Sequence, residues 1–216
     1  MEKTILSLFD VNISLDLLLD ALKLDKDDDA AHEVSILYEE ALKVAKPVAV
    51  YMPLTPVFVD NAIILNRVTI KEPFVFDKLS GSGPVIAYVV SCGVELDVWS
   101  KTVTGFFEQF VAEALMQLYL KLMTEELSAE IKRKFFDENK FASTISPGSQ
   151  PGWLITGQSS LFDILGSVKE DIGVELKDNL LMSPAISFSG IFFQTSDEYH
   201  NCHQCTRSSC NAVYGS

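Results

Sequence analysis

The chain has 216 residues, 48% of them hydrophobic and 22% charged, which is the composition of a folded globular protein long enough for one sizeable core. Seventeen basic against thirty acidic residues give a net charge of −13, and such a surface disfavours binding to nucleic acid or to anionic membranes. Because no apolar stretch is long enough for a membrane span and the N-terminus lacks a secretion signal, we expect a cytoplasmic protein with reduced cysteines.

The N-terminal part of the chain is predicted to contain one strand and two helices. Residues 4–9 are typical of a short strand, and leucines at helical spacing follow the possible cap Ser14. A second helix is expected over residues 30–46. The aspartate-rich run 25–29 could be a cation-binding loop, but it lacks the glycine and terminal glutamate of a calcium loop, so we interpret it as a solvated turn.

The next segment is rich in strand-forming residues. Residues 48–59 are broken by Pro53 and Pro56, a pattern that favours an edge strand. One or two further short strands are expected over residues 61–70, and a helical turn over 74–79.

Residues 84–92 form an uninterrupted apolar run, which predicts a strand at the centre of its sheet. Cys92, at the end of this run, is interpreted as a buried small hydrophobe. The Gly81-Ser82-Gly83 turn precedes the strand instead of following it, so it is not a dinucleotide-binding fingerprint. Glu95 and Asp97 could be a catalytic carboxylate pair, although the first turn of a helix is the simpler interpretation.

Helical periodicity dominates the second half of the chain. Helices are expected over 95–123, 125–138 and 158–172, with an irregular segment over 144–153 and a final strand over 185–193. The expected buried stripe of the first of these helices consists of Phe106, Phe110, Ala114, Leu118 and Leu122.

Strands and helices are interspersed without regular βαβ alternation, which indicates the α+β class with an antiparallel or mixed sheet flanked by helices. We expect a single domain over residues 1–199 and a cysteine-rich tail over 200–216. No catalytic motif of the hydrolase or metalloprotease type is present, and with only three histidines a histidine-based triad has few candidates.

The tail carries the clearest chemical motif. Cys202, Cys205 and Cys210 have C-x2-C-x4-C spacing, which lets three thiolates converge on one point. Clustered cysteines in a cytoplasmic chain favour metal binding over disulfides. An iron–sulfur cluster and zinc both remain open, and His200 or His203 could complete a Cys3His zinc site; free thiols in a tail are the simplest alternative.

Three blocks in fixed order carry a family resemblance. They are residues 88–97 (YVVSCGVELD), 146–148 (SPG) with 158–165 (QSSLFDIL) downstream, and 180–193 (LLMSPAISFSGIFF). Over roughly residues 65 to 193 the chain resembles the activation domain of cobalamin-dependent methionine synthase, particularly its stand-alone versions. The resemblance implies one α+β domain with a twisted antiparallel sheet and an extended groove that binds S-adenosylmethionine. It further implies that the methyl group is presented to the cobalt of a cobalamin held by a corrinoid partner such as methionine synthase.

The resemblance places Ser146, Pro147, Gly148, Phe192 and Phe193 in the groove, with no catalytic residue of the chain's own. The chain also departs from the family pattern. Thr144 stands where the family has an arginine for the methionine carboxylate, Ser149 stands where it has a tyrosine, and Phe192 lacks a tyrosine hydroxyl.

Two functions follow from these matches and losses. The first is an accessory protein for reductive activation and remethylation of a corrinoid methyltransferase, with a metal site in its tail; an iron–sulfur cluster there would let it donate electrons. The alternative is a non-catalytic module that binds a corrinoid protein, has lost S-adenosylmethionine binding, and uses zinc to fix its tail.

Overall fold

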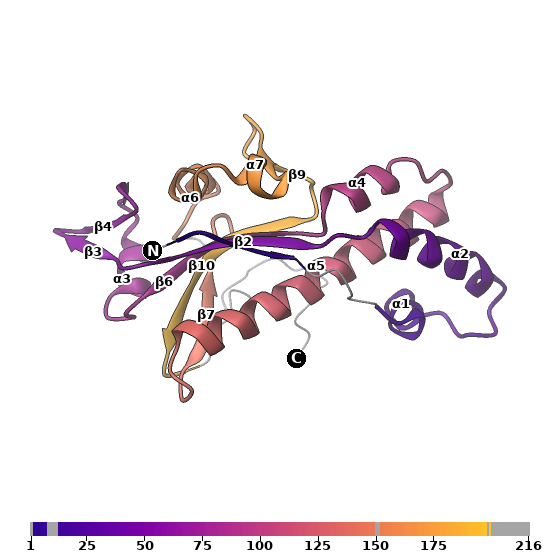
Figure 1. Cartoon of the computed structure of the whole chain (residues 1–216), viewed down its shortest axis with the longest axis horizontal. Coiled ribbons are helices and arrows are strands. Elements are labelled where there is room, and N and C mark those ends of the chain that lie inside the picture. Colours follow the sequence, from indigo (N-terminus) through magenta and orange to yellow (C-terminus); the bar gives the residue numbers. More distant parts are fainter. Residues whose placement is uncertain (1, 8–12, 150–151, 198, 200–216) are drawn as a thin grey trace.

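The computed structural model describes residues 2–7, 13–149, 152–197 and 199. A five-stranded sheet in the order β1-β2-β6-β10-β7 lies at its centre, and every pair of neighbouring strands is antiparallel. These strands are β1 (Thr4–Ser7), β2 (Val48–Leu54), β6 (Val85–Ser91), β7 (Phe141–Ile145) and β10 (Ser187–Thr195). Helices pack around this sheet (Figure 1), so the predicted α+β class is confirmed.

The middle strand β6 explains the uninterrupted apolar run in the sequence. It lies between β2 and β10, and all seven of its residues are buried. A strand covered on both faces needs apolar side chains at every position instead of at alternate ones. The prediction of a central strand here is confirmed.

Different elements cover the two faces of the sheet. On one face the side chains of Ile86 and Tyr88 pack against the C-terminal half of the long helix α5 (Phe106–Phe135). On the other face Ala87 and Val89 share a core with α6 (Gly157–Leu165), α7 (Val168–Ile172) and α3 (Pro73–Leu79). Figure 1 shows α6 and α7 on one side of the sheet and α5 crossing the other.

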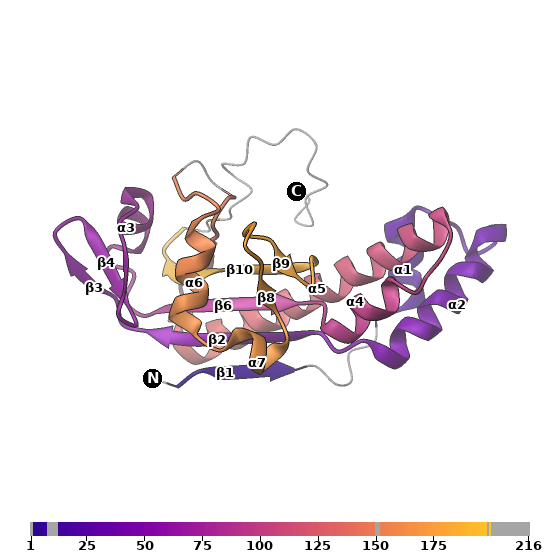
Figure 2. The same cartoon turned by 90° about the horizontal axis from the view of Figure 1, so that it is seen from above.

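The remaining helices form one end of the molecule. There α1 (Leu15–Leu22), α2 (Asp29–Val44), α4 (Val94–Ser100) and the N-terminal half of α5 enclose a second core (Figure 2). As predicted, Ser14 caps α1, since its hydroxyl accepts a hydrogen bond from the Leu17 N–H at 3.2 Å. Among the described residues, no helix combines the length and the apolarity that crossing a bilayer requires.

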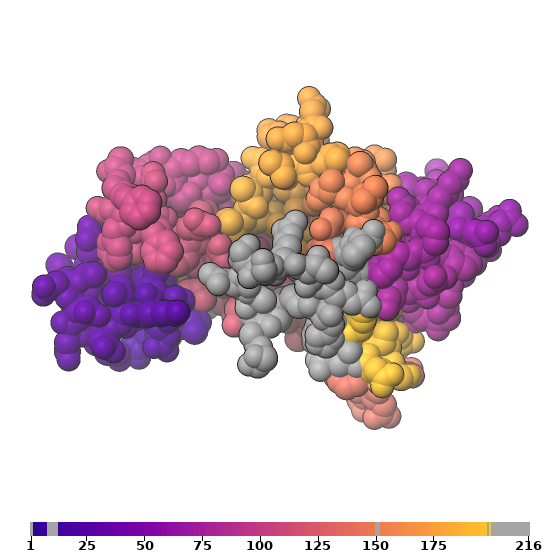
Figure 3. Space-filling model, turned by 180° about the vertical axis from the view of Figure 1, so that it is seen from behind, coloured from indigo at the N-terminus to yellow at the C-terminus, as the bar shows by residue number. Residues whose placement is uncertain are grey.

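The opposite end carries a small three-stranded sheet. It consists of β3 (Val57–Val59), β4 (Ala62–Leu65) and β5 (Val68–Ile70) in that order. Helix α3 packs against it through an edge-to-face contact of Phe58 with Phe76, whose ring centroids are 5.5 Å apart. Figure 3 shows this end and the helical end on either side of the middle of the molecule. A short ladder of β8 (Glu175–Leu176) and β9 (Met182–Ser183) precedes β10.

The predicted buried stripe of the long helix is wrong at its two phenylalanines, whereas Ala114, Leu118 and Leu122 are half-buried and pack against the helical core. Phe106 is 93% exposed and Phe110 is 55% exposed. The helix also begins only at Phe106, after a break that follows α4, and it continues without interruption to Phe135. The residues of α5 that are buried are Val111, Ala112, Leu115, Met116, Tyr119, Met123, Leu127 and Ile131. Because α5 has apolar residues on more than one face, periodicity alone could not select the face that its neighbours cover.

Two further predictions need correction. β2 is not an edge strand, because it pairs with both β1 and β6. Its Pro53 is tolerated because β1 pairs with β2 only from Val48 to Tyr51, so Pro53 has a partner strand on one side alone. The helix expected over residues 158–172 is two helices, α6 and α7, separated at Gly166, whose φ is +74°.

Candidate functional site

The loop that follows β7 is compact. Ser146 and Pro147 are buried, whereas Gly148 is exposed. The Gly148 N–H donates to the carbonyl of Trp153 at 2.8 Å, which closes the loop on itself. Gly148 has φ +75°, and a Cβ there would lie 2.9 Å from Ile155 Cδ1, so both conformation and space favour glycine. Of the segment 144–153, which was predicted to be irregular, Thr144 and Ile145 belong to β7 instead, and residues 150 and 151 lie outside the described part of the chain.

The three sequence blocks meet at Gly190. This residue of β10 is paired with Tyr88 of β6, and β10 pairs with β7 on its other side. A Cβ on Gly190 would lie 2.6 Å from the Ile145 carbonyl oxygen, 2.7 Å from Ser146 Oγ and 3.0 Å from the Tyr88 hydroxyl. Only a residue without a side chain fits between these groups. Blocks separated by about a hundred positions in the chain thus form one contiguous region of the sheet.

The two phenylalanines predicted to line one groove lie on opposite faces of the sheet. Phe192 packs against Tyr88 beneath α5, with ring centroids 4.5 Å apart. Phe193 belongs to the core on the other face, and its ring lies 6.4 Å from that of Tyr199. Both are 2% exposed. The structure therefore brings Ser146 close to Gly190, but it does not place both rings beside one groove, since successive strand residues alternate between faces.

Position 144 lies where the resemblance expects an arginine. Thr144 is half-buried in β7 and pairs directly with Phe192 of β10. Its short hydroxyl side chain cannot supply the bidentate guanidinium contact that a carboxylate prefers. The described loop therefore offers backbone groups and one serine hydroxyl, but position 144 carries no positive charge.

The metal prediction falls outside the described residues. Cys202, Cys205 and Cys210 all lie there, so the metal site stays a prediction. Within the described segments, no group of three His, Cys, Asp or Glu side chains is arranged to hold a metal ion, and this includes the aspartate-rich turn before α2. Cys92 is fully buried, as predicted, and burial raises the pKa of its thiol to about 12, with a smaller contribution from Asp97.

The two carboxylates considered as a catalytic pair have a structural role. Glu95 and Asp97 both lie in the first turn of α4. Glu95 forms an ion pair with Lys46 at 3.0 Å, and Asp97 forms one with Lys101 at 2.6 Å. The interpretation as dipole-stabilising residues is confirmed.

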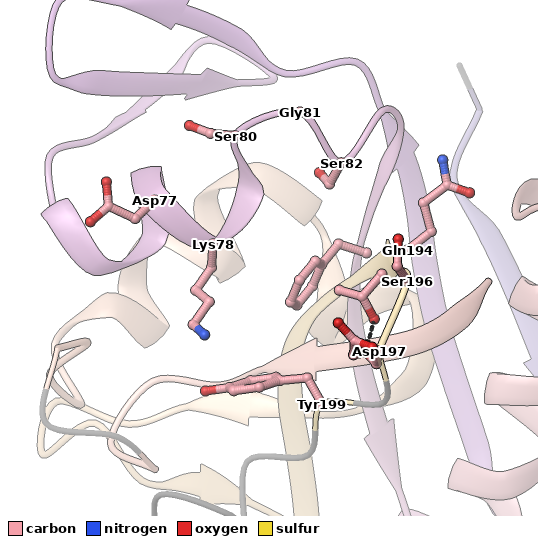
Figure 4. Close-up of a pocket in the computed structure, with 11 residues that line it drawn as sticks. Asp77, Lys78, Ser80, Gly81, Ser82, Gln194, Ser196, Asp197 and Tyr199 are labelled. Atoms are coloured by element: carbon pink, nitrogen blue, oxygen red, sulfur yellow. Dashed lines mark hydrogen bonds between the residues drawn. The ribbon is translucent and has the colours of Figure 1, made fainter.

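A hollow that the sequence did not suggest lies between α3 and the end of β10 (Figure 4). Its volume is about 410 Å³. The lining residues come from two distant segments and are Asp77, Lys78, Ser80, Gly81, Ser82, Phe193, Gln194, Thr195, Ser196, Asp197 and Tyr199. In the sequence, the Gly81-Ser82-Gly83 turn marks one wall of the hollow, but the second wall comes from the end of the final strand, more than a hundred residues later. Only the fold brings the two segments together.

Comparison with known proteins shows which fold the chain has. No protein-family model matches the sequence, and none of the curated proteins matches it. Among solved structures, the crystal structure of the MetH reactivation domain bound to AdoHcy matches with a TM-score of 0.61. The match covers 91% of this chain and 80% of that one, at 18% sequence identity.

The chain has the fold of the MetH reactivation domain. The structural match extends over more of the chain than the three sequence blocks, and it includes the helical end. At 18% identity the likeness concerns the fold, and the site must be argued from the residues of this chain. In this fold the Ser146–Gly148 loop and Gly190 lie where the resembling blocks converge, and of these residues only Gly148 is exposed.

Proposed function

We propose that this chain is an accessory protein for the reductive activation and remethylation of a corrinoid methyltransferase such as methionine synthase. The observation that carries the proposal is the convergence of the three blocks at Gly190 within a fold shared with a reactivation domain that was crystallised with AdoHcy. In this role the chain would act on a corrinoid that a partner protein holds.

Such a role consists of one reduction and one methyl transfer. One electron reduces cob(II)alamin to cob(I)alamin, and the cobalt then takes the methyl group of S-adenosylmethionine, which leaves S-adenosylhomocysteine. In this chain the exposed backbone at Gly148 would contact the nucleoside-bearing ligand, and the buried Ser146 and Pro147 would support the loop behind it. Because Thr144 is uncharged, the carboxylate of that ligand would have no cationic partner at position 144. The loop residues therefore fit the ligand only in part, and we expect weak binding.

The tail supplies the second part of the proposal. Cys202, Cys205 and Cys210 would hold an iron–sulfur cluster or zinc, as their spacing indicates. A bound iron–sulfur cluster would supply the electron. Iron, sulfide and zinc analysis of protein purified without oxygen distinguishes these possibilities: a zinc-loaded, colourless protein would remove the electron-donating role.

A second candidate function is supported by Thr144. Without the arginine, the chain would dock on a corrinoid protein without presenting a methyl donor. Calorimetric titration with S-adenosylmethionine and AdoHcy separates the two candidates. Binding of either ligand supports the methyl-donor role, and absence of binding by both supports the docking role.

Both candidates require a complex with a corrinoid protein. The direct test is co-elution of the full chain with cob(II)alamin-loaded methionine synthase that lacks its own reactivation domain. The matched control is the same protein without cobalamin. Failure to form a complex with either form would contradict both candidates.

A further inference from the structure

The hollow between α3 and the end of β10 holds opposite charges that do not pair within the described part of the chain. Lys78 Nζ lies 4.0 Å from the centroid of the Tyr199 ring and 5.8 Å from that of Phe74. Neither Lys78 nor Asp197 takes part in any ion pair among the described residues. Figure 4 shows both beside the Tyr199 ring, reached from different elements.

Contacts among the described residues hold each wall of the hollow. The Thr195 hydroxyl donates to the backbone carbonyl of Asp197 at 2.7 Å, and the Tyr199 N–H donates to Ser143 Oγ at 3.3 Å. The segment after β10 is thereby fastened to β7. On the other wall, the ammonium of Lys78 rests against aromatic rings, a position that cation–π attraction stabilises. These contacts hold the two walls of the hollow in place without a ligand.

The chemistry of the walls selects a class of ligand. One wall offers an ammonium donor and the other a carboxylate acceptor, while the half-buried ring of Tyr199 adds an apolar surface. With Asp77 and Asp197 against Lys78, the lining has more negative than positive groups, which disfavours phosphate and other anions. A volume of about 410 Å³ falls in the range of small-molecule sites.

We propose that this hollow binds a free α-amino acid with an apolar side chain. The carboxylate of the ligand would accept from Lys78, its ammonium would donate to Asp197, and its side chain would pack on the ring of Tyr199. The site is separate from the Ser146–Gly148 loop. Thr195 pairs with Phe141 at the start of β7, whereas the loop follows the other end of that strand. The inference therefore stands independently of the proposed function.

The test is calorimetric titration of the full chain with L-leucine, L-methionine and L-phenylalanine. Each is compared with its amide, which lacks the carboxylate, and with its N-acetyl derivative, which lacks the ammonium. We expect at least one free amino acid to bind and both of its derivatives to bind about tenfold or more weakly, because each loses a charge-assisted contact.

Variants locate the binding. Lys78→Met and Asp197→Asn should each weaken binding by about tenfold or more, whereas Lys78→Arg should retain it. The matched control is Lys71→Met, because Lys71 is an exposed lysine just before the same helix and does not line the hollow. Unchanged melting temperatures confirm that the variants fold. Absence of binding by all three amino acids, equal binding of the derivatives, or full affinity in Lys78→Met would overturn the proposal.

Discussion

Phe192 of β10 lies directly opposite Thr144 of β7 in the antiparallel ladder. Directly paired residues in such a ladder project their side chains from the same face of the sheet. A longer side chain at position 144 would therefore extend beside the Phe192 ring, at the edge of the sheet and two residues before the buried Ser146. Position 144 is thus the place where a single substitution can change ligand binding with little effect on the core.

Thr144→Arg should strengthen binding of AdoHcy. A guanidinium at this position can hold the amino-acid carboxylate through two parallel hydrogen bonds, and we expect a gain of about tenfold or more in affinity. Thr144→Lys is the matched control, because it adds the same charge without the bidentate geometry and should give a smaller gain. Calorimetry measures both. Equal affinities of wild type and Thr144→Arg, with the fold retained, would contradict this placement of the ligand.

Gly190→Ala should destabilise the protein. The added methyl group would lie 2.6 Å from a backbone carbonyl oxygen and 2.7 Å from Ser146 Oγ, so β7 and β10 must separate. We expect a loss of about 1–3 kcal/mol in the free energy of unfolding, which denaturant titration measures.

The adjacent residue offers the control for Gly190→Ala. Ser189 is also buried, and its hydroxyl has no hydrogen-bond partner among the residues that the structure describes. Ser189→Ala removes an unsatisfied polar group and should leave stability unchanged or raise it. If both variants lost the same stability, steric crowding at Gly190 would not be the cause.

Cys92 should be inert to thiol reagents in the native protein. It is fully buried, and a thiol whose pKa is about 12 yields almost no reactive thiolate at neutral pH. In the variant Cys202→Ser, Cys205→Ser, Cys210→Ser, Ellman's reagent should detect no thiol until denaturant is added, and then one. Rapid reaction without denaturant would show that the core around Cys92 opens.

Glu130 should make stability depend on pH in the acidic range. A hydrogen bond from Lys134, followed by one from Arg133, lowers the pKa of its carboxyl from the ordinary value of 4.5. A group with a lowered native pKa stabilises the fold above pH 4.5, and this contribution is lost as the pH falls through the native pKa. Because solvent screens these ion pairs, Glu130→Gln should cost about 1 kcal/mol or less at pH 7.

The control for this pH dependence is Glu126→Gln, an exposed position on the same helix. The difference between wild type and Glu130→Gln should shrink below pH 4.5, and Glu126→Gln should follow wild type throughout. Chemical denaturation at a series of pH values measures both. A constant difference between wild type and Glu130→Gln down to acidic pH would refute the assignment.

Local patterns in the sequence were sufficient for several elements. The apolar run of β6 predicted both its central position and the burial of Cys92, because a strand covered on two faces has a distinctive composition. Ser14 marked the start of α1 by its capping side chain. The face of α5 could not be predicted, because Phe106 and Leu115 are equally apolar and only the neighbouring elements decide which is buried.

The resemblance placed Ser146 and Phe192 in one groove, and this stays a prediction. In the structure Ser146 directly follows β7, which pairs with the strand β10 that carries Phe192. The opposite orientation of Phe192 and Phe193 follows from the two-residue period of a strand and could have been predicted. The hollow at Lys78 could not have been predicted, since its second wall comes from residues 193–197 and 199 and depends on how β10 ends.

The most direct measurement is a single-turnover methyl transfer. Methyl-labelled S-adenosylmethionine, a one-electron reductant and cob(II)alamin-loaded methionine synthase without its own reactivation domain are mixed with or without the full chain. We expect labelled methylcobalamin only when the chain is present. Equal labelling in its absence, or no labelling with it while intact methionine synthase is methylated in parallel, would contradict the account.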